Sequence, residues 1–161
     1  MRYAQDAGLR PKPMPTDQSP PVLRALRGEI SRFRAGLADP AFLALSVLGL
    51  AAWLLPRPGY LLSPGMLLFK AAVEEAAFRA GLQDILDSAL PAKPRMGPLS
   101  LANLLASAAF ALAHLFGHPP LWAGLVFLPS LAFGLLWDRR RSLLLCILLH
   151  FLYNFLLFYR P

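Results

Sequence analysis

Three short motifs place polar side chains inside segments that are otherwise strongly apolar. They are Glu74, Glu75 and Arg79, then Phe110 and His114, and finally His150 and Asn154. Ionisable side chains are costly in hydrocarbon, so at membrane depth they indicate a functional site. Together the three segments contribute two carboxylates, two imidazoles, a guanidinium and a carboxamide. That set predicts a hydrolytic site built from three separate helices.

The first motif has a definite helical geometry. Glu75 and Arg79 are four residues apart, so they share a helix face and are expected to form an ion pair. Glu74 points about 100° around the same helix and is expected to have no partner within its own segment. Glu74 is therefore free to act as a general base. The structural alternative is a buried ion pair beside a glutamate that faces water.

The other two motifs supply the imidazoles. Asn103, Ser107, Phe110 and His114 follow one another at spacings of four, three and four, which predicts one stripe that faces other helices. A lone histidine on an apolar helix is usually a hydrogen-bonded interior residue. Two of them on separate segments, with an unpaired glutamate on a third, could orient a water molecule. The set Glu74, His114 and His150 could instead bind zinc with water as the fourth ligand. His118, beside a proline in a turn, is interpreted as an ordinary loop residue.

Composition indicates a membrane protein. The chain has 161 residues, of which 57% are hydrophobic and only 16% are charged. A soluble domain of this size has about 25% charged residues. The apolar runs are long and lack the two-residue alternation of a barrel strand, so they are interpreted as helices.

These runs predict an all-α fold, a polytopic transmembrane helical bundle of about five spans. The predicted spans run from about Ala41 to Leu55, Ser63 to Asp87, Leu99 to Phe116, Leu121 to Trp137 and Leu143 to Tyr159. Pro91 to Pro98 are predicted to form a loop, and residues 117–120 a tight turn between antiparallel helices. The single cysteine, Cys146, lies among leucines and is interpreted as a core residue. No secretory signal peptide is expected.

The chain divides into a basic N-terminal arm, residues 1–39, and a transmembrane domain, residues 40–161. Residues 1 to about 20 are rich in proline and are expected to lack fixed structure. Residues 22–37 predict a basic amphipathic helix that lies on an anionic membrane surface, although packing on the domain itself is an alternative. Nucleic-acid binding is not expected, because the arm has no aromatic stacking pattern.

Loop charges predict an orientation. With a cytoplasmic N-terminus, twelve Lys and Arg residues fall on the cytoplasmic side and only Arg57 and Arg160 on the other. This asymmetry is what the positive-inside rule predicts. It favours an odd number of spans and an external C-terminus.

The three motifs resemble those of a known family. Glu74-Glu75-Ala-Ala-Phe-Arg79 is similar to the Glu-Glu-x-x-x-Arg motif of the CAAX-protease and bacteriocin-processing (CPBP, or Abi) family of intramembrane endopeptidases. Phe110 with His114 matches its Phe-x-x-x-His motif, and His150 with Asn154 its His-x-x-x-Asn motif. The order agrees, and each motif falls on its own predicted span. The resemblance covers roughly residues 64–158.

The resemblance implies a role for each residue. Glu74 would activate water, His114 and His150 would hold that water and the transition state, and Asn154 would stabilise the oxyanion. Glu75 and Arg79 would be a supporting pair, with Phe110 also in support. The resemblance favours a metal-independent glutamic mechanism with no cofactor, and zinc held by Glu74, His114 and His150 is the alternative.

The predicted function is therefore intramembrane proteolysis. The expected partners are the lipid bilayer and a membrane-embedded protein or peptide substrate, such as a C-terminal sorting signal or a secreted, bacteriocin-like peptide. The expected location is a bacterial inner membrane. One alternative is a catalytically inactive immunity or scaffold protein of the same fold. Another is a small ion or proton transporter, but the fourth predicted span supplies almost no polar path.

Overall fold

The chain is predominantly helical in the computed structural model, which describes residues 19–55, 59–90 and 94–159. The expectation that residues 1–20 lack fixed structure falls almost entirely outside these residues. The elements in chain order are α1 (Pro21–Leu37), α2 (Pro40–Leu48), the 3₁₀ helix η1 (Gly49–Leu54), α3 (Pro64–Glu75), the π-helix η2 (Ala76–Gln83), α4 (Asp84–Ala89), β1 (Arg95–Met96), β2 (Leu99–Ser100), α5 (Leu101–His114), α6 (Pro120–Leu125), α7 (Phe127–Arg140) and α8 (Leu143–Phe158).

Prolines and small polar caps explain where the first helices begin. Pro21 is the first residue of α1, and Pro40 is the first residue of α2. Proline suits this position because its missing N–H has no partner within the helix. The Asp39 carboxylate accepts a hydrogen bond from the Ala41 N–H at 2.7 Å and caps α2. The predicted amphipathic helix and first span are confirmed as helices, and they meet at a bend of 68°.

The helix that carries Glu74 is less regular than the sequence indicates. It begins as predicted at Ser63, whose hydroxyl accepts from the Met66 N–H at 3.2 Å. Directly after Glu75, however, the α-helix gives way to the π-helix η2, and α4 then continues it. Spacing in the sequence did not predict this segment. π-Helical turns inside α-helices are rare and are often found at functional sites.

A short antiparallel hairpin begins in the predicted loop, and its second strand, β2, takes the first two residues of the predicted third span. Arg95 pairs with Ser100 and Met96 with Leu99. Gly97 at the turn has a φ of 61°, a conformation that glycine adopts without the steric cost of a Cβ. The fold is therefore mostly helical but not purely α.

The second half of the chain is a helical hairpin followed by a final helix. The Ser100 hydroxyl caps α5 by accepting from the Asn103 N–H at 3.0 Å. The turn after α5 leads into α6 and α7, as predicted. At the end of α7, Arg141 adopts the left-handed conformation, and Ser142 then caps α8.

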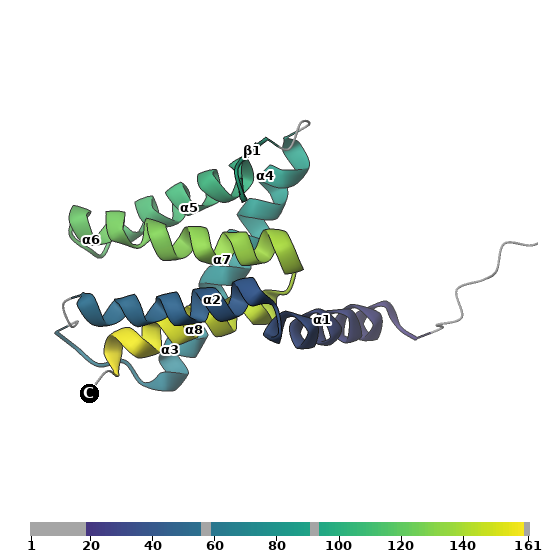
Figure 1. The fold of residues 1–161 in the computed structure, drawn as a ribbon, viewed down its shortest axis with the longest axis horizontal. Coiled ribbons are helices and arrows are strands. Elements are labelled where there is room, and N and C mark those ends of the chain that lie inside the picture. Colours follow the sequence, from purple (N-terminus) through teal and green to yellow (C-terminus); the bar gives the residue numbers. More distant parts are fainter. Residues whose placement is uncertain (1–18, 56–58, 91–93, 160–161) are drawn as a thin grey trace, which may run out of the picture.

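Two pairs of helices, α2 with α8 and α5 with α7, are joined by the long helix α3–η2–α4 (Figure 1). α3 packs chiefly on α8, and α5 packs chiefly on α7. The long helix crosses from the first pair to the second, so Glu74 and Arg79 lie near the centre. One core cluster fills the space where α2, α7 and α8 meet. Its buried members are Phe42, Ala132, Phe133, Leu136, Trp137, Leu145, Cys146 and Leu149.

Helix length and composition identify fewer membrane crossings than five. Within the described residues, one helix, Pro120–Arg140, is long and apolar enough to cross a bilayer, and a second candidate exists if Pro21–Leu37 and Pro40–Leu54 form one bent span. Leu101–His114 and Leu143–Phe158 are apolar but shorter. The helix that carries Glu74 is not among these candidates, and its charged residues are Lys70, Glu74, Glu75, Arg79, Asp84 and Asp87. A five-span bundle is therefore not established.

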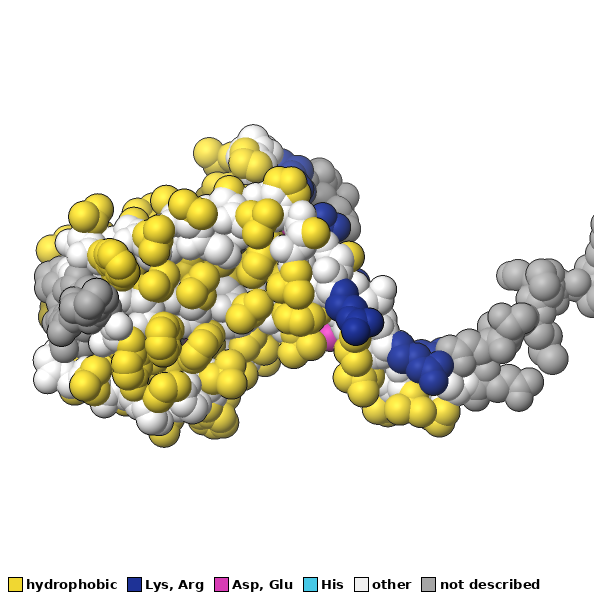
Figure 2. All heavy atoms as spheres, turned by 60° about the horizontal axis from the view of Figure 1, so that its bottom comes forward, with side chains coloured by type: hydrophobic (Ala, Val, Ile, Leu, Met, Phe, Trp, Pro, Cys, Tyr) yellow, Lys and Arg dark blue, Asp and Glu magenta, His cyan; other side chains and the backbone are white. Residues whose placement is uncertain are grey.

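The surface is nevertheless strongly apolar. Hydrophobic side chains cover most of the face in Figure 2, whereas the Lys and Arg side chains gather toward the end from which α1 projects. Large exposed side chains include Leu54, Phe116 and Leu121. Soluble monomers rarely expose contiguous apolar patches of this extent, so the surface suits contact with lipid.

Candidate active site

Glu74 lies at the edge of the candidate site, between a lysine and a histidine. Its Oε1 is 3.4 Å from Nζ of Lys70, one helical turn earlier, and its Oε2 is 3.5 Å from Nε2 of His150 on α8. The Glu74 side chain is 20% exposed. The prediction that Glu74 has no partner in its own helix is wrong, because Lys70 precedes it by four residues and the two share a helix face.

Glu75 is fully buried and connects two positively charged or protonatable groups. Arg79 Nε donates to its Oε2 at 3.2 Å, so the predicted ion pair is confirmed. Nδ1 of His150 lies 2.8 Å from the other oxygen, Oε1. A carboxylate only accepts hydrogen bonds, so this contact assigns the proton of the His150 ring to Nδ1. Glu75 therefore orients His150, a role that spacing within one helix could not reveal.

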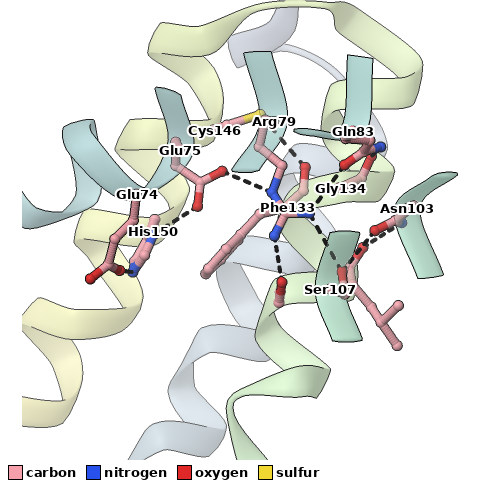
Figure 3. A network of polar contacts seen from close by, with 12 residues as sticks. Glu74, Glu75, Arg79, Gln83, Asn103, Ser107, Phe133, Gly134, Cys146 and His150 are labelled. Carbon is pink, nitrogen blue, oxygen red and sulfur yellow. Dashed lines mark hydrogen bonds and ion pairs between the residues drawn. The ribbon is translucent and has the colours of Figure 1, made fainter. Parts of the chain in front are cut away.

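Arg79 is the centre of a buried polar network that joins three helices (Figure 3). Besides Glu75, its guanidinium donates to Gln83 Oε1 at 3.1 Å, to Ser107 Oγ at 3.4 Å and to the Ser130 hydroxyl. Ser107 in turn donates to Asn103 Oδ1 at 3.0 Å. Gln83 and Ser130 were not singled out from the sequence. Each of these two residues is a polar side chain near or within an apolar segment of the sequence, and that feature could have identified them.

The backbone of α7 approaches this network closely at a glycine. Gly134 on α7 lies against Asn103 and Arg79, and a Cβ built on it would be 1.9 Å from Asn103 Oδ1. Gln83 Nε2 donates to the Gly134 carbonyl at 3.0 Å. Only a residue without a side chain fits at this crossing.

His114 is half-buried and held by the backbone of its own helix. Its Nδ1 lies 2.9 Å from the Phe110 carbonyl oxygen, an acceptor, so Nδ1 carries a proton in this contact. The Phe110 ring contacts both imidazoles, at centroid distances of 4.5 Å to His114 and 6.0 Å to His150. Phe110 is thus a spacer between the two histidines.

His118 lies in the turn after α5, as predicted, and its ring stacks on His114 with centroids 5.7 Å apart. Partial burial lowers the pKa of His118, and the charges of His114 and Lys70 lower it further, while Glu74 opposes them. The sequence interpretation of an ordinary loop residue missed this contact.

Glu74, His114, His150 and Asn154 line one cavity of about 510 Å³. Asn154 lies one turn beyond His150 on α8, and most of the remaining wall is apolar. The structure therefore brings all four predicted catalytic residues to a common space. Glu75, Arg79 and Phe110 support it, with only Phe110 itself on the cavity wall.

The candidate zinc ligands are Glu74, His114 and His150. In the described part of the chain, no three His, Cys, Asp or Glu side chains converge on a point that a metal could occupy. Glu75 holds His150 by Nδ1, and the Phe110 carbonyl holds His114 by Nδ1. Both contacts use Nδ1 and leave Nε2 of each ring available, so the choice between the metal-free mechanism and zinc held by Glu74, His114 and His150 stays a prediction.

Comparison with known proteins identifies the family. Residues 56–156 match the family described as type II CAAX prenyl endopeptidase Rce1-like. No curated protein and no solved structure matches the chain. The matched residues include all three motifs and cover more than half of the chain. The predicted CPBP resemblance is therefore confirmed, and the chain belongs to the Rce1-like family of type II CAAX prenyl endopeptidases, a family of membrane proteases.

Proposed function

We propose that this protein is an intramembrane endopeptidase in which Glu74 activates the attacking water. The observation that carries the proposal is the gap of 3.5 Å between Glu74 Oε2 and His150 Nε2. In a neutral His150 with its proton on Nδ1, both of these atoms are acceptors. Two acceptors at this separation need a shared hydrogen donor, and a water molecule on the cavity side can donate one hydrogen to each.

In the proposed hydrolysis, each of the four predicted catalytic residues has a defined role. Glu74 takes a proton from the water, and the resulting hydroxide adds to the carbonyl carbon of the scissile peptide bond. The Asn154 amide donates a hydrogen bond to the developing oxyanion. Collapse of the tetrahedral intermediate breaks the C–N bond, and the proton held by Glu74 passes to the leaving amine. His150, oriented by Glu75, and His114 hold the water and the intermediate in place. This route needs no metal ion.

We further propose the cellular setting predicted from the sequence. It is a bacterial inner membrane, with about five helices embedded, a cytoplasmic N-terminus and a membrane-associated protein or peptide as substrate. The apolar residues of α1 support its contact with lipid, because Val22, Leu26 and Ile30 remain exposed rather than packed on the bundle. A C-terminal sorting signal or a bacteriocin-like peptide would meet the requirement for an apolar segment.

Replacing Glu74 with glutamine tests the proposal. The purified chain in detergent micelles is incubated with a mixture of apolar peptides in ¹⁸O-labelled water, and mass spectrometry detects ¹⁸O in new C-terminal carboxyl groups. E74Q should reduce hydrolysis by about 10²–10⁴-fold, because the amide cannot accept the proton. The helical circular dichroism should stay unchanged.

Glu29→Gln is the matched control, since it makes the same change on α1, away from the cavity, and it should leave hydrolysis intact. Hydrolysis by E74Q at the wild-type rate would contradict the mechanism. A chain that never hydrolyses a peptide, although it is folded, would instead favour the immunity or scaffold alternative.

A further inference from the structure

The two ends of the bundle differ in how open they are. The cavity is lined at its rim by residues from helix ends and loops, among them Tyr60 before α3, His118 and Pro119 before α6, and Phe158 at the end of α8. Tyr60 and Pro119 are exposed. The elements that carry or adjoin these residues, among them α6, lie at one end of the bundle in Figure 1, opposite α1, α4 and β1. The cavity therefore opens toward that end, which we call the cavity end.

The opposite end, which we call the α1 end, is closed by ion pairs. Arg139 and Arg140 bind the buried carboxylate of Asp39. Burial alone would raise the pKa of Asp39, but the hydrogen bonds from the Ala41 N–H and the two guanidinium groups lower it overall. Arg141 pairs with Asp84 and with Asp87, the latter at 2.7 Å.

At the same end, α1 is held against the start of α8 by two hydrogen bonds. Glu29 Oε1 accepts from the Ser142 hydroxyl at 2.8 Å and from the Leu144 N–H at 2.9 Å, at the start of α8. Among the described residues, none of those that form these contacts lines the cavity. Between this end and Glu74 lie the Arg79 network and the core residues Leu136 and Leu145, all fully buried. Packed and paired side chains therefore separate the α1 end from the site.

Lys and Arg residues are distributed unequally between the two ends. The described residues Arg24, Arg27, Arg32, Arg34, Arg95, Arg139, Arg140 and Arg141 belong to α1, β1 and the end of α7. Residues 49–55, 59–62 and 112–126, which lie toward the cavity end, contain no Lys or Arg, and Lys70, paired with Glu74, is the one Lys or Arg among the described residues that line the cavity. Figure 2 shows the same asymmetry on one face. The positive-inside rule places the basic end in the cytoplasm.

We propose that the cavity opens to the non-cytoplasmic side of the membrane and admits its substrate from there. The inference rests on the proposed protease function. The substrate is then an exported polypeptide with an apolar segment in the bilayer, cut on the side facing away from the cytoplasm. The cavity wall fits such a segment, because it is mostly apolar and includes Leu62, Trp122 and Leu157. A cytoplasmic lipid-modified C-terminus would approach the closed end.

Accessibility to a thiol reagent tests the side to which the cavity opens. Gly59→Cys and Gly117→Cys mark the cavity end, where an added side chain meets nothing within 4 Å. Ser88→Cys and Met96→Cys mark the α1 end at exposed positions. The native Cys146 is fully buried and gives little background. A charged, membrane-impermeant maleimide is added to intact spheroplasts of cells that express the full chain, and to permeabilised ones.

We expect G59C and G117C to react at least about tenfold faster than S88C and M96C in intact spheroplasts, because a charged reagent crosses hydrocarbon poorly. Permeabilisation should remove the difference. The opposite pattern, with S88C and M96C reactive from outside, would overturn the proposal. Repeating the labelling in an E74Q background separates topology from catalysis, since labelling needs no hydrolysis.

The side of substrate entry is tested with sealed vesicles of each orientation. A peptide probe with an apolar segment and a charged head is added outside, and incorporation of ¹⁸O is compared with E74Q vesicles. Right-side-out vesicles should hydrolyse the probe at least about tenfold faster than inside-out ones, because the charged head resists transfer through the bilayer. Faster hydrolysis by inside-out vesicles would overturn the proposal. If neither orientation hydrolyses the probe while labelling follows the expected pattern, the proposed function and its substrate fail, but the orientation stands.

Discussion

Two polar clusters lie next to each other on the same helix, and they differ in how well their groups are satisfied. Around Arg79, hydrogen bonds to Glu75, Gln83, Ser107 and Ser130 use four of the five guanidinium N–H donors, and every member is fully buried. Around Glu74, the partners Lys70 and His150 are 3.4 and 3.5 Å away, and the carboxylate faces a cavity.

The Arg79 cluster is therefore suited to stabilising the fold, and the Glu74 cluster is suited to catalysis. A buried network whose groups are paired fixes the positions of helices, since breaking any one contact leaves a polar group without a partner. A cluster with longer contacts and access to a cavity leaves room for water and for a peptide bond. Glu75 belongs to both clusters, because it binds Arg79 with one oxygen and His150 with the other.

The largest expected effect comes from breaking the closed cluster. Arg79→Leu leaves Glu75 as a buried charge without its guanidinium partner, and we expect a loss of about 3–5 kcal/mol in the free energy of unfolding. Reaction of the buried Cys146 thiol with a fluorescent maleimide during heating in detergent reports the unfolding. Arg27→Leu on the exposed face of α1 is the control, with a change of no more than about 0.5 kcal/mol. Equal melting of R79L and the wild type would show that the network is dispensable.

The residue shared by the two clusters should show both phenotypes. Glu75→Gln removes the charge that Arg79 and His150 share, so we expect a loss of stability together with a loss of hydrolysis by about 10²-fold or more. E74Q, in contrast, should lose hydrolysis alone. Thiol reactivity on heating and ¹⁸O incorporation are measured on the same preparations. Full activity of the folded E75Q variant would contradict the assignment of Glu75 to both clusters.

Asn154 belongs to the open cluster only. Asn154→Ala should lower kcat by about 10²–10³-fold, as removal of one oxyanion donor does in other hydrolases, and leave KM nearly unchanged. The unfolding temperature should stay close to the wild-type value. The measurement is the dependence of ¹⁸O incorporation on peptide concentration. An effect on KM alone would assign Asn154 to substrate binding.

Ser107 belongs to the closed cluster only. Ser107→Ala removes the acceptor for Arg79 and the donor for Asn103, so we expect a loss of about 1–3 kcal/mol in stability. Hydrolysis per folded molecule should not change. Ser88→Ala, at an exposed position on α4, is the matched control. A drop in kcat without a change in melting would place Ser107 in the reaction.

The smallest effect is expected at the rim of the open cluster. Lys70→Met removes an ion pair whose lysine side chain is 48% exposed, and exposed pairs contribute about 0.2–1 kcal/mol. Hydrolysis should change by a few-fold at most, and lysine replaced by arginine should restore it. A loss of activity as large as that of E74Q would mean that Lys70 takes part in the chemistry.

Local patterns in the sequence were enough to predict most helices and to single out four residues that the structure places around one cavity. The apolar runs located the starts of α2, α3 and α8 to within a few residues, and spacing of four residues identified the pair of Glu75 and Arg79. The three motifs identified the family. These features depend on contacts between residues a few positions apart, which a single helix geometry fixes.

Tertiary structure decided what those residues contact. The link from Glu75 to His150 spans 75 positions, and that from Arg79 to Ser130 spans 51, so no spacing rule within one helix could predict either. The π-helix after Glu75, the close approach at Gly134 and the stacking of His118 on His114 also arise from packing between helices. The sequence thus determined which side chains were available for hydrolysis, while the packing of α3, α5, α7 and α8 decided which of them face a cavity and which are held in a closed network. The physical reason is that helix-forming patterns act over one or two turns, whereas a cavity exists only where separate helices fail to fill the space between them.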